Sequence, residues 1–83
     1  MGKVIDVVIE VVSAALDIPV TDIKPDMRLV DNEDISFGTL GGILDKLEEK
    51  CWVTFFPQDM GRMETLEDLA ELIESKKKEL RPI

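Results

Sequence analysis

Histidine is absent from the sequence, and cysteine occurs once among its 83 residues. The lack of histidine removes the commonest general base and the commonest metal ligand. A lone cysteine forms no internal disulfide, so a reducing compartment is the default. No constellation of nucleophile and base is visible either. We therefore expect a protein that is not an enzyme and that holds no metal.

Basic residues are also scarce, with 10 lysines and arginines against 18 aspartates and glutamates, for a net charge of −8. Binding to a nucleic-acid backbone needs a basic face, so nucleic acid is not expected as a partner. Acidity of this degree suits docking to proteins that carry Lys and Arg patches. The alternative is that the charge merely keeps a small protein in solution, and composition does not separate the two.

The sequence also lacks an apolar run long enough to span a bilayer. The N-terminus lacks the charged-then-apolar pattern of a signal peptide. We expect a cytoplasmic protein. At this length we also expect one domain over residues 1–83, which exists as a monomer.

The spacing of polar residues predicts a first helix over residues 3–16, although its many Val and Ile residues also suit a strand. These polar positions are Lys3, Asp6, Glu10, Ser13 and Asp17. They fall three or four apart, which makes a solvent-facing stripe on a helix. Pro19 ends this helix near Asp17.

The remaining chain reads as a long loop followed by three further helical segments. Residues 17–34 are a connection whose apolar residues anchor it on the helices. After the central helix, residues 57–60 start a short helical turn that Gly61 ends. Thr65 and Asp68 cap a last helix. Its buried face consists of Leu66, Leu69, Leu72 and Ile73.

The central stretch, residues 31–49, places an acidic cluster and a lone serine in front of an amphipathic helix. The apolar positions of this helix are Phe37, Leu40, Ile43, Leu44, Leu47 and Cys51. Asp34 or Ser36 caps the first turn, because either side chain accepts from the free N–H groups there. The Ser36 hydroxyl then lies at the positive end of the helix dipole, which favours a phosphate diester.

In its order of elements the sequence resembles the acyl carrier protein and peptidyl carrier family over nearly the whole chain. The pieces that match are Leu16-Asp17-Ile18, Asp22-Ile23-Lys24-Pro25-Asp26, Leu29-Val30-Asp31, Leu47-Glu48-Glu49-Lys50 and Thr65-Leu66-Glu67-Asp68. The segment Ser36-Phe37-Gly38-Thr39-Leu40 is similar to the attachment region of D-alanyl carrier proteins.

The resemblance implies an all-α fold, a four-helix bundle of three longer helices and one short one, that performs no chemistry itself. It also implies a 4′-phosphopantetheine arm on Ser36, added by a phosphopantetheinyl transferase, that carries an acyl or aminoacyl group as a thioester. The partners would be that transferase and acyl-activating or acyl-transferring enzymes of fatty acid or polyketide biosynthesis with basic docking patches. The candidate partner-binding residues are Asp34, Phe37, Asp45, Glu48 and Glu49.

The attachment motif departs from the family pattern, which has Asp immediately before the serine and usually Leu after it. Here Ile35 precedes Ser36 and Phe37 follows it. Carrying the family spacing without gaps puts Phe37 at the attachment position. A one-residue shift puts Ser36 there instead, and Phe37 then joins the buried stripe of the helix. The shifted register predicts a carrier, and the ungapped register predicts a carrier-like fold without the arm that acts as an interaction module.

Five further residues in or after the central helix carry expectations of their own. Gly41 and Gly42 lie inside the helix at a cost of roughly 1 kcal/mol each. Close packing against another helix, or local fraying, is the favoured reason, and the alternative is that the bare backbone admits a cargo chain or a partner side chain close to the helix. Trp52 and Phe56 could anchor a partner if exposed, but a core role under the long loop is preferred. Cys51 is expected to be a buried hydrophobic residue and not a nucleophile.

Overall fold

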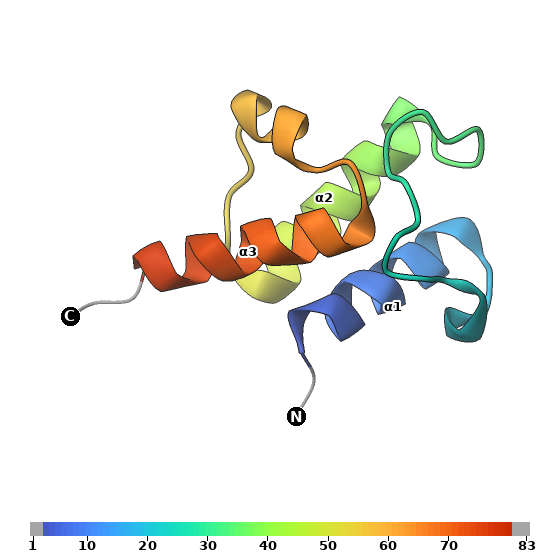
Figure 1. Ribbon diagram of the computed structural model, residues 1–83, viewed down its shortest axis with the longest axis horizontal. Helices are drawn as coiled ribbons and strands as arrows, with labels where there is room; N and C mark the ends of the chain where they lie inside the picture. Colours follow the sequence, from blue (N-terminus) through green and yellow to red (C-terminus); the bar gives the residue numbers. More distant parts are fainter. Residues whose placement is uncertain (1–2, 81–83) are drawn as a thin grey trace.

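The computed structural model describes residues 3–80, and these residues are all-helical with no strand among them. The elements are α1 (Val4–Leu16), the 3-10 turn η1 (Val20–Asp22), α2 (Phe37–Cys51), the 3-10 helix η2 (Pro57–Arg62) and α3 (Leu66–Leu80) (Figure 1). This arrangement confirms the predicted bundle of three longer helices and one short helix. It also confirms the long loop between α1 and α2.

Helix α1 has the boundaries that its polar stripe predicts. The Lys3 N–H donates to the Asp6 carboxylate at 3.2 Å, which satisfies one free donor of the first turn. Asp17 ends the helix in the left-handed conformation, with φ of 57°, and Pro19 follows. The Val and Ile residues did not produce a strand, because on a helix they face the core, where Val8 and Val12 are buried.

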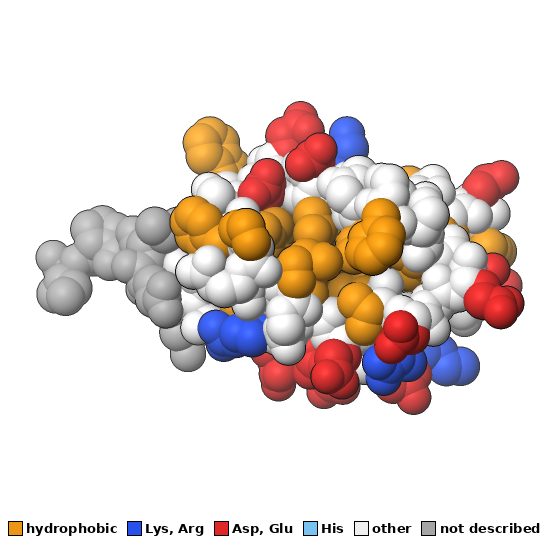
Figure 2. All heavy atoms as spheres, turned by 90° about the horizontal axis from the view of Figure 1, so that it is seen from above, with side chains coloured by type: hydrophobic (Ala, Val, Ile, Leu, Met, Phe, Trp, Pro, Cys, Tyr) orange, Lys and Arg blue, Asp and Glu red, His pale blue; other side chains and the backbone are white. Residues whose placement is uncertain are grey.

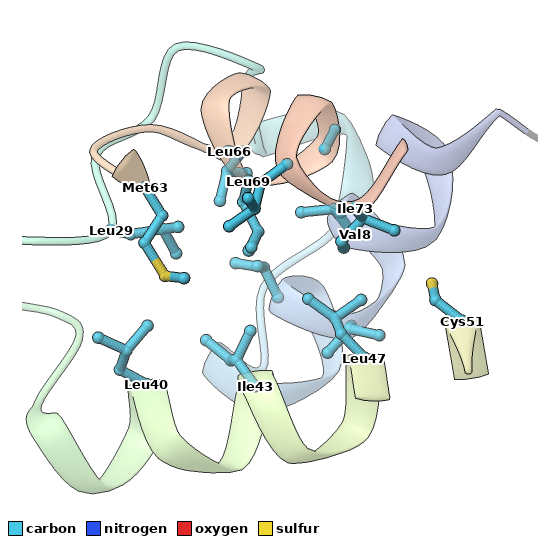
Figure 3. Packing of buried hydrophobic residues seen from close by; sticks show 14 of the residues in the cluster. Val8, Leu29, Leu40, Ile43, Leu47, Cys51, Met63, Leu66, Leu69 and Ile73 are labelled. Atoms are coloured by element: carbon cyan, nitrogen blue, oxygen red, sulfur yellow. The ribbon is translucent and has the colours of Figure 1, made fainter. Parts of the chain in front are cut away.

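The hydrophobic core lies where α1, α2 and α3 meet, and α1 packs against both other helices. In Figure 3, Leu40, Ile43 and Leu47 point from α2 toward the α3 side chains and Val8 of α1. The buried residues labelled there also include Leu29, Cys51, Met63, Leu66, Leu69 and Ile73. The predicted buried faces of α2 and α3 are therefore confirmed, apart from Phe37.

The long loop is anchored by backbone hydrogen bonds as well as by apolar side chains. The Leu29 N–H donates to the Glu64 carbonyl at 2.8 Å, and the Leu66 N–H donates to the Met27 carbonyl at 3.0 Å. The side chains of Ile23 and Leu29, which belong to this loop, are buried. These contacts tie the loop to the start of α3, which fixes where α2 begins.

The short helix η2 is fastened to α3 by a charged pair. The Lys76 ammonium lies 2.8 Å from the Asp59 carboxylate, which also accepts the Phe56 N–H at 2.7 Å. The same ammonium is 4.9 Å from the centre of the Phe56 ring. The expectation that Gly61 ends this segment is off by one residue, since η2 continues to Arg62.

The aromatic link between α2 and η2 differs from its expected core role. Trp52 is 86% exposed and Phe56 is 51% exposed, whereas Val53 is buried. Trp52 ends α2 in the left-handed conformation, with φ of 58°, and this turns its side chain out of the bundle. An extended link buries alternate side chains only, and Val53 takes the inward place.

Candidate functional site

The start of α2 and the loop that leads into it form the candidate site. We call this region, residues 29–37 with Leu40, the head surface. Asp31 turns the chain with φ of 54°, a left-handed conformation that Asp tolerates better than most residues. Asn32 then organises the loop, because its side chain donates to the Arg28 carbonyl and accepts from the Asp34 N–H, each at 2.9 Å.

Ser36 is the N-cap residue of α2, and it is one of the two residues predicted for that position. Its hydroxyl oxygen accepts the Thr39 N–H at 3.2 Å and its hydroxyl donates to the Thr39 hydroxyl oxygen at 3.0 Å. The residue is exposed. The other predicted cap, Asp34, does not cap the helix, and its side chain is exposed in the loop.

Phe37 is the first residue of α2, and its side chain is 88% exposed. The expectation that Phe37 joins the buried stripe of the helix is wrong. Ile35 of the loop is buried near the start of the stripe, and Leu40 is the first helical residue that reaches the core. Ile35 and Leu40, on either side of Phe37, take the places that face the core, so the Phe37 side chain is left in solvent.

A hollow of about 700 Å³ lies at the head surface. It is lined by Leu29, Val30, Asp31, Asn32, Glu33, Ile35, Ser36, Phe37 and Leu40. Figure 2, which views the molecule from above Figure 1, shows hydrophobic side chains gathered at the middle of the face that it presents, with acidic and some basic side chains around the edge. An apolar centre with a polar rim is also the arrangement found at many protein–protein interfaces.

The predicted acidic contacts fall into two groups. Asp34, Asp45 and Glu49 are exposed. Glu48 is half-buried, and its carboxylate accepts the Phe55 N–H at 2.7 Å. Glu48 therefore holds the link after α2 in place, which leaves it a smaller role at the surface.

The loop residues Leu29, Val30 and Ile35 give the hollow its apolar wall, and the sequence analysis did not name them as site residues. Their signal was weak, because they are separate apolar positions in an irregular segment. Only the hydrogen bonds made by Asn32 and by the start of α3 bring them beside Phe37.

Ser36 meets two requirements for carrying a phosphopantetheine arm and does not meet a third. It is exposed, and it lies at the N-terminus of a 15-residue helix, where a phosphate group is favoured. In the family motif, however, an Asp precedes the serine, and Asp is itself a favoured N-cap. Here the N-cap is Ser36, and the residue that follows the cap is Phe37. The ungapped register, in which Ser36 corresponds to the Asp and Phe37 to the serine, puts the Asp position at this N-cap.

None of the helices within residues 3–80 has the length and apolar character needed to cross a bilayer. The same residues contain no group of three or more side chains placed to hold a metal ion. A scan against models of protein families and a search of curated proteins both find nothing that matches the chain.

Proposed function

We propose that this protein is a non-enzymatic docking module, built on a carrier-like helical bundle, whose head surface binds a partner protein with a basic rim and an apolar pocket. The observation that carries the proposal is Phe37, a large aromatic side chain left 88% exposed at the first residue of α2. An exposed aromatic side chain beside a hollow is the kind of residue that dominates binding energy at interfaces.

The expected energetics divide between the aromatic ring and the carboxylates. Burial of a Phe side chain contributes about 1.5–3 kcal/mol, so Phe37→Ala is expected to weaken the complex by about tenfold or more. Asp31, Glu33 and Asp34 are exposed, and they favour a basic partner mainly by raising the association rate. Replacing them with neutral amides should slow association and reduce its dependence on salt.

The second candidate is the carrier function, with the arm on Ser36 and acyl or aminoacyl cargo. It is favoured by the exposure of Ser36 and by its place at a helix N-terminus. Its partners would be a phosphopantetheinyl transferase and acyl-transferring enzymes.

One experiment distinguishes the two candidates. The protein is incubated with a broad-specificity phosphopantetheinyl transferase and coenzyme A, and its intact mass is measured. The docking proposal expects no mass gain in the wild type. It also expects a mass gain in Ser36→Asp/Phe37→Ser, because this variant supplies the Asp-Ser pair of the family motif in the ungapped register. The matched control Ser36→Ala/Phe37→Ser has the serine without the Asp that the transferase requires, and it should show no gain. A gain in the wild type that disappears in Ser36→Ala would overturn the proposal and establish the carrier function.

The partner itself is sought by photo-crosslinking from Phe37 in the cells that make the protein. A photoreactive phenylalanine analogue replaces Phe37, and the matched control places it at Val20, which is 48% exposed and lies away from the head surface in η1. A crosslinked protein with a basic surface, seen from Phe37 and not from Val20, is the expected result. Equal crosslinking from both positions, or none from either, would refute a docking role for the head surface.

A further inference from the structure

A second hollow lies between α1 and α2, away from the head surface, with a volume of about 550 Å³. It is lined by Glu10, Val11, Ala14, Ala15, Gly42, Ile43, Lys46 and Lys50. The floor is apolar. Glu10 stands on the α1 side, and the two lysines stand on the α2 side. No residue of this α1–α2 groove belongs to the head surface.

No contact among the described residues requires a glycine at position 42. A Cβ built at Gly42 meets no atom within 4 Å, and the same holds for Gly41. The expectation that these glycines allow close packing against another helix of this chain is therefore wrong. Each one lowers the helix propensity of α2 relative to alanine, without a compensating contact in the described residues. At Gly42 the bare backbone faces the groove, so a neighbour from outside the chain can approach it closely.

Lys46 and Lys50 lie one helical turn apart at the edge of the groove. Among the residues whose side chains the structure describes, neither ammonium has a carboxylate within ion-pair distance, and the ion pairs found there are Arg28–Asp31 and Asp59–Lys76. Like charges at this spacing destabilise a helix. In a protein with 18 acidic residues, two lysines one turn apart, without an ion-pair partner among the described side chains, provide charge complementarity for an acidic ligand.

We propose that the α1–α2 groove docks an acidic amphipathic helix of a second partner protein. Its apolar side chains lie over Ala14 and Ala15, which are exposed, and its backbone approaches Gly42. A pair of its acidic residues, four positions apart, faces Lys46 and Lys50. This inference goes beyond the proposed function, because it names a different surface and a partner of opposite charge.

A helix fits these features for geometric reasons. The two ammonium groups repeat at the spacing of one helical turn, and acidic residues four apart on a helix repeat at the same spacing. Small residues on a helical surface allow another helix axis to come close, at the short end of the usual 8–10 Å range. Helix-in-groove docking of this kind is a common mode of protein recognition.

The test is a selection from a phage-displayed library of helical peptides against the folded, full-length protein. The selected peptides are then measured by titration against the wild type and three variants. Gly42→Leu fills the groove and Gly41→Leu makes the same change one residue away, outside the lining. Lys46→Glu/Lys50→Glu reverses the charge of the edge. Leu is a better helix former than Gly, so neither leucine variant should fail to fold.

The expected result is a set of peptides with Glu or Asp at positions four apart. They should lose about tenfold or more in affinity for Gly42→Leu and for the charge-reversed variant, and change little for Gly41→Leu. Their binding should weaken as salt is raised and be unaffected by Phe37→Ala, which tests the head surface separately. Recovery of no binding peptide, or of peptides that bind Gly42→Leu as well as the wild type, would overturn the inference.

Discussion

The glycines of α2 allow a quantitative prediction: Gly41→Ala and Gly42→Ala should each make the protein more stable. Both residues have helical backbone angles in the interior of a 15-residue helix, and neither has a positive φ. A new Cβ at either position enters open space, so no packing clash opposes the change. The gain is the full difference in helix propensity, about 1 kcal/mol per substitution.

This gain should be easy to measure. In a domain of this size 1 kcal/mol raises the Tm by about 4–8 °C, and the double variant should approach twice the shift of either single variant. Thermal unfolding followed by far-UV circular dichroism gives the Tm, and urea unfolding gives the free energy. The m-value should not change, because the substitutions barely alter the surface exposed on unfolding.

Gly38→Ala provides a matched control in the same helix. Gly38 lies in the first turn, and its Cβ would come 3.9 Å from the Ser36 hydroxyl oxygen, which is ordinary contact. The substitution should stabilise less than those at 41 and 42, because the first turn is only partly fixed by intrahelical hydrogen bonds. A fall in Tm for Gly41→Ala or Gly42→Ala would refute the reasoning, since it would mean that the glycine backbone makes an essential contact inside the folded chain.

Three further predictions concern stability and reactivity. Ser36→Ala removes the cap of α2 and should lower the free energy of unfolding by about 1 kcal/mol, as measured in urea, whereas Ser36→Asp should keep most of it. Asp59→Asn should destabilise the protein by about 1–2 kcal/mol, and a double-mutant cycle with Lys76→Met should show coupling between the two side chains; strict additivity would contradict the ion pair. The Lys76 hydrogen bond lowers the pKa of Asp59 from its ordinary 3.8, so its contribution is present above that pH and is lost as the pH falls below it, where Asp59→Asn should converge on the wild type. Burial raises the pKa of the Cys51 thiol, although Lys77 and Lys50 oppose the shift, so a thiol reagent should label Cys51 only at the rate of unfolding; rapid labelling of the native protein would contradict this.

The sequence by itself determined the helices and most of the core. The polar stripe of residues 3–16 identified α1 despite its Val and Ile content, because periodicity reports which face meets the core. Thr65 and Asp68 identified the start of α3, and in the structure each side chain bonds the backbone N–H of the other at 3.2 Å. Such capping is a local interaction, so sequence spacing suffices to find it.

Only the tertiary structure decided which residues at the two ends of α2 face solvent. Phe37 and Trp52 fit an apolar pattern, yet both are more than four-fifths exposed. Phe37 is exposed because Ile35 and Leu40 take the core-facing places around the start of the helix, and Trp52 is exposed because the left-handed end of the helix turns it outward. These facts depend on where the loop is anchored and where the bundle ends, through contacts between residues distant in the sequence. Helical periodicity predicts which face of a helix is apolar, but it does not predict how far along the helix that face meets the core.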